Sequence, residues 1–338
     1  MPGEPSERTS REEVALRNQE MLERALTPLV LTALADPDVI EILANPDGRV
    51  YVEKLGDRPR EVGYLPPSRV MGAISAIAHM QNTVISIDRP RLECAMRFGG
   101  HRFSAQIPPI VDSPAYCIRK RASRVFTLED FAEQGVMQNW HVDVLRQAVR
   151  DRKNIVVAGG TASGKTTLLN GIIHAMAETH PHDRFISAED TRELQCRALN
   201  LVFMQTTETV SMRDVVKMML RMRPDRIICG EVRDGAMFEL LKAWNTGHPG
   251  GAVTLHANDV GVVSLDAPLR RIENLVSEAT LSNQGHLIGE AVDFVVNIKK
   301  DNFQRRVTSI IHCDGWIGGE YQVSRLGPDA QGRLQVAV

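Results

Sequence analysis

The pattern of apolar and polar residues changes near residue 140, which divides the chain into two parts. In the first part, apolar residues at helical spacing predict helices over residues 12–35 and 68–81. Residues 39–48 and 50–53 predict two short strands around an Asn-Pro-Asp-Gly turn, and further strands are predicted at 97–107 and 116–119. Helices and strands mixed in this way predict a small α+β domain over residues 13–120.

Two stretches that flank this domain lack its regular pattern. Residues 1–12 are polar and contain prolines, so we expect them to be disordered. Residues 121–140 begin with several arginines and contain a glycine break at Gly135, so they are predicted to form a linker.

The second part, residues 141–338, alternates short apolar strands with amphipathic helices. The predicted strand and helix pairs are 155–158 with 165–178, 184–188 with 212–222, 226–229 with 236–244, and 252–256 with 264–276. Further strands are predicted at 294–298, 307–311 and 321–323. This alternation predicts an α/β fold in which a mostly parallel sheet carries helices on both faces.

Composition narrows the class of protein. The formal net charge of -2 gives no general reason to expect nucleic acid as a partner. Five cysteines lie far apart without a Cys-x-x-Cys pair, which argues against a zinc or disulfide framework and indicates a reducing cytoplasm. The apolar stretch at 25–35 is too short to span a bilayer. A cytoplasmic protein is therefore expected, and peripheral attachment to a membrane machine stays open.

A glycine-rich turn between the strand at 155–158 and the helix at 165–178 carries the clearest chemistry. Its pattern, Gly159-x-x-x-x-Gly164-Lys165-Thr166, is that of a phosphate-binding loop in the strand–loop–helix context that this motif needs. Backbone N–H groups and the helix dipole would hold phosphates, Lys165 would approach the β- and γ-phosphates, and the Thr166 hydroxyl would bind Mg²⁺. The predicted nucleotide-binding residues are Gly159, Gly160, Thr161, Ala162, Ser163, Gly164, Lys165, Thr166 and Thr167.

Hydrolysis needs a group that positions water, and the strand at 226–229 supplies a candidate at its end. Glu231 follows this strand, although the usual Walker B pattern has Asp where this chain has Gly230. Asp190, in the segment 187–193, offers a carboxylate from a neighbouring strand end. His256 ends the next strand and is a candidate sensor of the γ-phosphate, whereas His248 on the preceding turn is a weaker one.

Residues 88–124 form a basic segment. Its cations are Arg89, Arg91, Arg97, Arg102, Arg119, Lys120, Arg121 and Arg124, against Asp88, Glu93 and Asp112. Three interpretations are possible for this segment. It is a solvated basic face, or a nucleic-acid surface that lacks stacking aromatics, or a source of arginines that reach a nucleotide. The charges alone do not distinguish them.

Four motifs occur in order: the phosphate loop, Ala188-Glu-Asp-Thr-Arg-Glu-Leu194, the segment 220–233, and Lys242-Ala-Trp-Asn-Thr-Gly-His-Pro-Gly-Gly followed by Leu-His-Ala-Asn. Together they resemble the secretion ATPases of type II and type IV secretion systems and type IV pili, and most of all their conjugation branch. The resemblance covers the second half and, more weakly, the first domain. The larger type II members often carry a four-cysteine zinc module, which this sequence lacks.

The resemblance implies a hexameric ring of subunits with a PAS-like N-terminal domain and a RecA-like P-loop domain, with ATP and Mg²⁺ bound. Its partners would be inner-membrane components of a secretion machine, with no requirement for nucleic acid, at the cytoplasmic face of the inner membrane. By position, the matching motif residues are Glu189, Asp190 and Glu193 (acidic box), Gly230 and Glu231 (atypical Walker B), His248 and His256 (histidine box), Arg221, Arg233, Arg102 and Arg119. Arg102 and Arg119 match positions expected to face phosphates.

These observations predict an ATPase in which Glu231, Lys165, Glu189 and His256 carry the reaction. Closure of the small domain on ATP and reopening after hydrolysis would drive a membrane-bound partner. Three alternatives stay open: a DNA-stimulated translocase or related pilus or type II motor, a nucleotide switch that does not hydrolyse ATP, and a small-molecule kinase. ATP and GTP are not distinguished.

Overall fold

The structure is a computed structural model of the 338-residue chain. It describes residues 20–21, 23–54, 56–97, 99–121, 125–207, 209–257, 264–301, 304–328 and, for the backbone alone, 334–337. The stretch predicted to be disordered, 1–12, lies outside these residues, as does Arg124. The chain divides into two compact units, Met1–Ser123 and Arg124–Val338.

The first unit is built on an antiparallel sheet with the strand order β3-β2-β1-β6-β5-β4. Its elements are α2 (Pro28–Ala35), β1 (Val39–Ala44), β2 (Arg49–Lys54), β3 (Arg60–Tyr64), α3 (Pro67–Met80), β4 (Arg91–Ala95), β5 (Arg102–Gln106) and β6 (Ala115–Arg119). Alternate strand residues such as Ile42, Phe103 and Ile118 pack against Ile74 and Ile77 of α3 in one apolar core. The mixture of helices and strands agrees with the α+β prediction, and its PAS-like class stays a prediction.

Two details of this unit differ from the sequence prediction. The helix expected over 12–35 is interrupted before Pro28, because proline fits the first turn of a helix but not its interior. Strands β3 and β4 were not predicted, since each has an exposed, charged pattern that resembles a loop.

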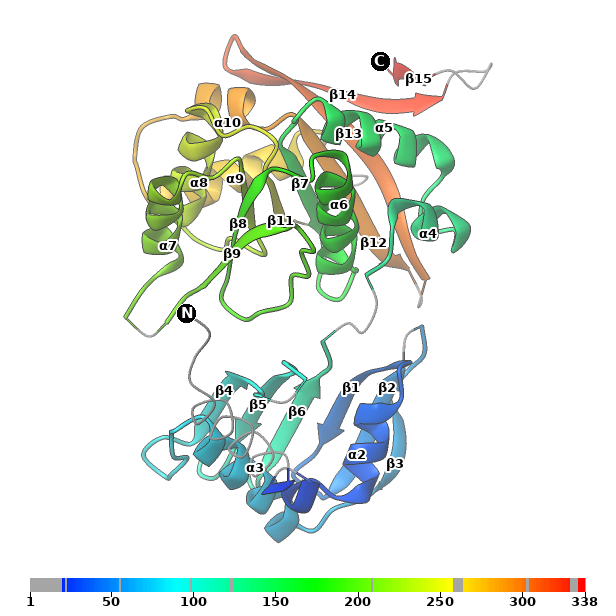
Figure 1. The fold of residues 1–338 in the computed structure, drawn as a ribbon, viewed down its shortest axis with the longest axis vertical. Coiled ribbons are helices and arrows are strands. Elements are labelled where there is room, and N and C mark those ends of the chain that lie inside the picture. Colours follow the sequence, from blue (N-terminus) through cyan, green and yellow to red (C-terminus); the bar gives the residue numbers. More distant parts are fainter. Residues whose placement is uncertain are drawn as a thin grey trace, which may run out of the picture. The chain divides into compact units, whose positions relative to one another are not determined.

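The second unit contains a nine-stranded sheet with the order β15-β14-β13-β12-β7-β11-β10-β8-β9 (Figure 1). The strands are β7 (Ile155–Gly159), β8 (Arg184–Glu189), β9 (Asn200–Gln205), β10 (Arg226–Cys229), β11 (Ala252–His256), β12 (Phe294–Asp301), β13 (Gln304–Ile317), β14 (Glu320–Pro328) and β15 (Leu334–Ala337). The six strands from β12 to β9 in this order are parallel to one another, and β13, β14 and β15 extend the sheet beyond β12 with antiparallel pairing.

Helices cover both faces of this sheet. They are α4 (Leu128–Glu133), α5 (Asn139–Arg150), α6 (Lys165–Thr179), α7 (Met212–Met219), the 3-10 helix η1 (Leu220–Met222), α8 (Ala236–Asn245), α9 (Ala267–Ser277) and α10 (Gly285–Ala291). Ile155 and Val157 of β7 pack with α4, α5 and α6, whereas Val156 and Ala158 pack with α7 to α10. Two apolar layers therefore enclose strands that are buried on both sides, as the parallel arrangement requires.

The segment 121–140, predicted as a linker, belongs in large part to the second unit. It contains α4, whose Leu128 and Phe131 are buried in the layer around α6. Thr127 and Asp130 form a capping box that fixes the start of this helix. The prediction missed it because the helix is only 6 residues long.

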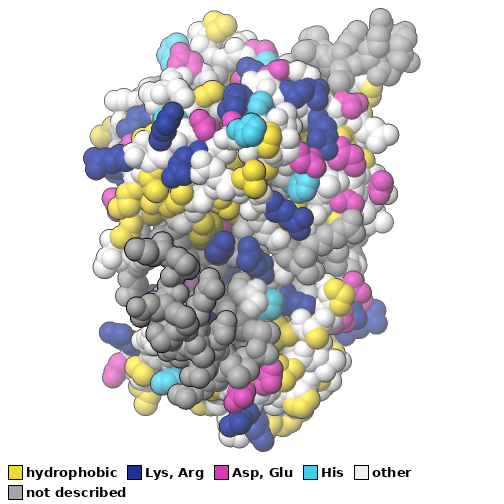
Figure 2. All heavy atoms as spheres, viewed as in Figure 1, with side chains coloured by type: hydrophobic (Ala, Val, Ile, Leu, Met, Phe, Trp, Pro, Cys, Tyr) yellow, Lys and Arg dark blue, Asp and Glu magenta, His cyan; other side chains and the backbone are white. Residues whose placement is uncertain are grey.

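The surface mixes charges of both signs. On the face seen in Figure 2, Lys and Arg side chains lie among Asp and Glu side chains. Among the described residues, no helix has both the length and the apolar character needed to cross a bilayer.

Candidate nucleotide-binding site

The phosphate loop joins the end of β7 to the start of α6. Strand β12 borders β7 so closely that a Cβ on Gly159 would lie 2.2 Å from the carbonyl oxygen of Ile298. Gly164 caps α6 with a φ of +97°, a left-handed conformation that glycine adopts without strain. The sequence therefore has glycine where the backbone needs it, and the loop directs the amino end of a helix at the carboxyl edge of the sheet.

Lys165 folds back onto this loop. Its Nζ donates to the carbonyl oxygens of Gly159 (3.0 Å) and Gly160 (2.8 Å), and its side chain is buried. Burial lowers the pKa of this ammonium group, and the nearby carboxylate of Glu231 works in the opposite direction. The buried hydroxyl of Ser163 has no hydrogen-bond partner within the described part of the chain. A buried cation and an unsatisfied hydroxyl in a glycine loop fit a phosphate ligand.

His256 lies beside the loop because β11 pairs with β7. It is the register partner of Gly159, and its Nδ1 lies 3.3 Å from Lys165 Nζ. Burial and then the charge of Lys165 lower the pKa of this imidazole, against the opposing effect of Glu231. The ring is therefore neutral at neutral pH and can relay hydrogen bonds between its neighbours.

Glu231 stands two residues after β10 and completes the cluster. One carboxylate oxygen lies 3.0 Å from His256 Nε2, an ion-pair distance without hydrogen-bond alignment, and the other accepts a hydrogen bond of 2.7 Å from Arg233 Nη2. Burial would raise the pKa of Glu231, but the hydrogen bond from Arg233 and the charges of Arg233 and Lys165 outweigh burial and hold the pKa below its ordinary value. A continuous polar chain thus links the phosphate loop to a half-buried, ionised carboxylate.

The acidic segment at the end of β8 contains one buried and one exposed carboxylate. The carboxylate of Glu189 is buried and accepts backbone N–H bonds from Glu193 (3.1 Å) and Leu194 (2.9 Å). Asp190 is exposed and accepts a bond of 3.0 Å from the Thr206 hydroxyl. Glu189 is therefore engaged in holding the following loop, and a direct role at phosphate stays a prediction.

Arg221 and His248 lie at the opposite edge of the sheet from the phosphate loop. Arg221 is exposed on η1, which precedes β10. His248 precedes β11, and its Nδ1 lies 3.1 Å from the carbonyl oxygen of Pro224. Because the loop follows the carboxyl end of β7, residues that precede parallel strands cannot reach it within one chain.

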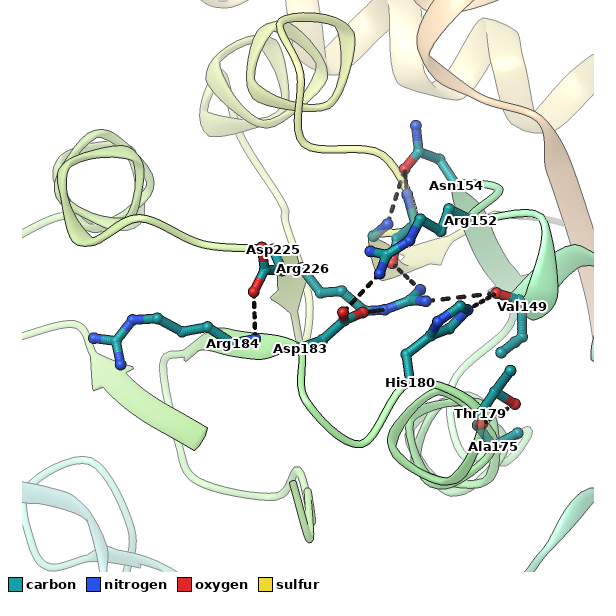
Figure 3. A network of polar contacts seen from close by, with 12 residues as sticks. Val149, Arg152, Asn154, Ala175, Thr179, His180, Asp183, Arg184, Asp225 and Arg226 are labelled. Atoms are coloured by element: carbon teal, nitrogen blue, oxygen red, sulfur yellow. Dashed lines mark hydrogen bonds and ion pairs between the residues drawn. The ribbon is translucent and has the colours of Figure 1, made fainter. Parts of the chain in front are cut away.

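That opposite edge is held by a buried polar network (Figure 3). Arg226 has no exposed surface, and its guanidinium donates to Asp183 (2.8 Å) and to the Gly250 carbonyl (2.9 Å). Arg152 reaches the other oxygen of Asp183 at 2.6 Å, and the Asn154 side chain accepts from the backbone of Gly250. The network ties the turn before β11 to β10 and to the turn after α6.

Arg102 and Arg119 lie in the first unit, where β5 and β6 bring them together. They are register partners, and Arg119 Nε donates to Glu41 of β1 at 2.6 Å. Like charges directly opposite on a sheet are unfavourable, and the carboxylate offsets this repulsion in part. That these arginines face phosphates stays a prediction.

One residue near the loop was missed by the sequence analysis. A Cβ on Gly164 would lie 2.9 Å from Cδ and 3.4 Å from Nε of Arg305, so this side chain of β13 lies against the loop. The only sequence signal was a group of basic residues, Lys299, Lys300, Arg305 and Arg306.

The chain is similar to known proteins over most of its length. Residues 91–302 match the family described as Type II/IV secretion system protein. A conjugal transfer protein TrbB of Rhizobium radiobacter is 44% identical over 301 residues, 89% of this chain and 92% of that protein. A probable conjugal transfer protein TrbB of Sinorhizobium fredii is 41% identical over 302 residues, 89% of this chain and 91% of that protein.

Solved structures show the same fold. The structure of the ATPase DotB of Legionella pneumophila matches with a TM-score of 0.57 at 18% identity. The match covers 91% of this chain and 79% of the DotB chain. The structure of the pilus retraction motor PilT with bound ADP matches with a TM-score of 0.56 at 18% identity. That match covers 92% of this chain and 83% of the PilT chain. The second unit accordingly has the RecA-like α/β fold of these proteins. With its conjugal transfer relatives and its family match, the chain belongs to the Type II/IV secretion system protein family, the secretion ATPases, and to their conjugation branch.

Proposed function

We propose that this protein hydrolyses ATP at the phosphate loop of its second unit and thereby powers the assembly of, or substrate transfer through, a conjugative type IV secretion system. The observation that carries the proposal is the chain of contacts from Lys165 through His256 to Glu231. It places a cation, a neutral imidazole and a carboxylate at one edge of a phosphate loop, which is the set of groups that phosphoryl transfer to water needs.

Binding uses the loop from Gly159 to Thr167. Its backbone N–H groups and the amino end of α6 hold the β- and γ-phosphates. Lys165 exchanges the carbonyl oxygens of Gly159 and Gly160 for phosphate oxygens, because an anion is a better partner for a buried ammonium group. The hydroxyl of Thr166 would hold Mg²⁺, which would neutralise phosphate charge.

Glu231 prepares the water molecule that attacks the γ-phosphate. Its carboxylate is ionised, because Arg233 and Lys165 lower its pKa, and an ionised carboxylate accepts a hydrogen bond from water. Arg233 occupies one of its oxygens in this structure. The second oxygen, near His256, is the one that would orient water, and the imidazole would report on the γ-phosphate to Glu231.

Coupling to a secretion machine requires a second set of groups. Arg102 and Arg119, from the first unit of the same or a neighbouring subunit of a hexamer, would spread the charge that develops on the phosphoryl group. Loss of the γ-phosphate would remove these contacts and let the subunit reopen against inner-membrane components of the machine. The name of the relatives, conjugal transfer protein, supports conjugation as the process.

Phosphate release from ATP by purified protein, sized for its oligomeric state, tests the proposal. We expect turnover by the hexamer without DNA, and loss of ATP binding in Lys165→Ala. Lys217→Ala, which removes an exposed lysine near Glu239, is the matched control and should behave as wild type. Turnover that appears only with single-stranded DNA would favour a translocase, and tight binding without phosphate release would favour a switch.

A further inference from the structure

Arg305 approaches the phosphate loop from the strand hairpin β12–β13. Its side chain covers Gly164, the residue that caps α6. A Cβ built on Gly164 would lie 2.9 Å from Cδ and 3.4 Å from Nε of Arg305. The same Cβ would lie 3.6 Å from Cδ1 of Ile298, so side chains of β12 and β13 line this side of the loop. Arg305 is half-buried. A guanidinium therefore lies beside the helix end at which the loop would hold phosphates.

The register of the hairpin explains why Arg305 faces the loop. Val307 pairs with Ile298 and both are buried in the layer that contains α6. Side chains two residues apart share a face of a strand, so Arg305 and its partner Lys300 continue this face toward the loop. Arg306 pairs with Lys299 on the opposite face. One basic pair thus points to the side of α6, and the other points away.

The strand order gives the site a direction. Glu231 and His256 follow β10 and end β11, which lie on one side of β7, whereas β12 and β13 lie on the other. A nucleotide whose γ-phosphate meets Glu231 has room to extend its other end away from β11. On that side of β7 lie β12 and β13, with Arg305 beside Gly164.

We propose that Arg305 binds the nucleoside of the nucleotide and contacts its ribose and base, not its terminal phosphates. The inference rests on the proposed function, since it needs a nucleoside triphosphate in the loop. A guanidinium is flat and stacks on planar rings, and it donates hydrogen bonds in its plane, so it suits a purine and its sugar. Lysine at this position would keep the charge and lose the flat surface.

Equilibrium titrations with ADP and with inorganic tripolyphosphate test this assignment, because only ADP carries a nucleoside. Arg305→Ala should weaken ADP binding about tenfold, or about 1.4 kcal/mol, and leave tripolyphosphate binding unchanged. Arg305→Lys should recover little of the ADP affinity. Arg306→Ala is the matched control, since it removes the same charge from the adjacent residue on the opposite face, and it should bind both ligands as wild type.

Three results would overturn the assignment: equal ADP affinity in Arg305→Ala and wild type, an equal loss of both ligands, or the same loss in Arg306→Ala. Wild-type protein that binds neither ligand would instead refute the proposed function. Thermal unfolding of each ligand-free variant shows whether it is folded. If Arg305→Ala does not fold, Arg305→Gln, which keeps most of the side-chain length, carries the same comparison.

Discussion

The side chain of Glu189 occupies the space next to Gly230 in which any other residue would place its Cβ. A Cβ on residue 230 would lie 2.5 Å from both Cγ and Oε1 of Glu189 and 2.9 Å from Cδ. The two residues meet because β8 and β10 are parallel neighbours, with Ala188 opposite Cys229. The usual Walker B aspartate cannot fit here while Glu189 holds its place. The missing Asp is thus replaced in space by a carboxylate from the adjacent strand.

Gly230→Ala should therefore destabilise the second unit. The contact is with a buried side chain that is fixed by backbone hydrogen bonds, so relief requires displacement of Glu189. Overpacking of this kind costs about 1–3 kcal/mol, measured as the change in free energy of unfolding in urea. Gly327→Ala is the control, because its Cβ would meet nothing within 4 Å, and it should change stability by less than about 0.5 kcal/mol. Equal stability of the two variants would contradict the account.

Glu189→Ala should lower stability by removing the carboxylate to which two backbone N–H groups donate. These groups belong to Glu193 and Leu194. An unsatisfied buried donor costs about 1–3 kcal/mol, so the loop from Asp190 to Leu194 should also exchange its amide hydrogens faster. Glu189→Gln keeps a carbonyl acceptor and should lose less. If the Gln variant exchanged as fast as the Ala variant, the hydrogen bonds would not be what orders this loop.

Arg233→Ala should shift the acid limb of the pH–rate profile to higher pH. The guanidinium helps to hold the pKa of Glu231 below its ordinary value, so its removal raises that pKa. A carboxylate with a lowered pKa becomes protonated, and stops acting as a base, only when pH falls to that lowered value. In the variant the pKa is higher, so Glu231 should become protonated at a higher pH. The measurement is kcat/KM for ATP against pH. Arg150→Ala, an exposed change that leaves Glu231 untouched, should not move the limb. An unmoved limb in Arg233→Ala would show that Glu231 is not the group that titrates.

Arg226→Ala should be among the most destabilising changes in the second unit. The guanidinium has no exposed surface, and its loss leaves Asp183 buried beside Arg152 alone. Breaking a buried ion pair costs about 3–5 kcal/mol, read from denaturant unfolding. Arg270→Ala breaks a more exposed Arg–Asp pair, with Asp266, and should cost at most about 1 kcal/mol. Similar costs for both would mean that burial of the network in Figure 3 does not strengthen it.

The sequence was sufficient for most of the parallel core of the second unit, but the edge strand β9 (Asn200–Gln205) was not predicted. Strand β7 is a continuous apolar run, β11 is mostly apolar, and each is followed by a helix with an apolar face, so the spacing of apolar residues and the order of elements both indicate the fold. Helix α10 was missed because Gly285 and Gly289 weaken a helical pattern. Both glycines are needed for close packing on β13, where a Cβ on Gly285 would lie 2.5 Å from Trp316. Such tertiary requirements leave no local signal.

A residue of the candidate site was predictable where the local sequence around it shows the strand or loop that positions it. Lys165 follows from the loop pattern, and Glu231 and His256 follow from strand ends at the same edge of the sheet. Two relationships were not predictable, because each joins residues far apart in the sequence. The contact of Glu189 with Gly230 depends on the order β8–β10, and that of Arg305 with Gly164 depends on a hairpin that extends beyond the parallel strands.

In the proposed mechanism, Glu231 prepares the water that attacks a phosphate held by the loop. Glu231→Gln keeps the shape of the side chain and removes its charge, so ATP should bind with wild-type affinity while phosphate release falls by about 100-fold or more. Glu278→Gln, at an exposed position after α9, should release phosphate at the wild-type rate. The decisive measurement is phosphate release by Glu231→Gln at saturating ATP: near-complete loss with ATP still bound is expected, and normal turnover would rule out this role of Glu231.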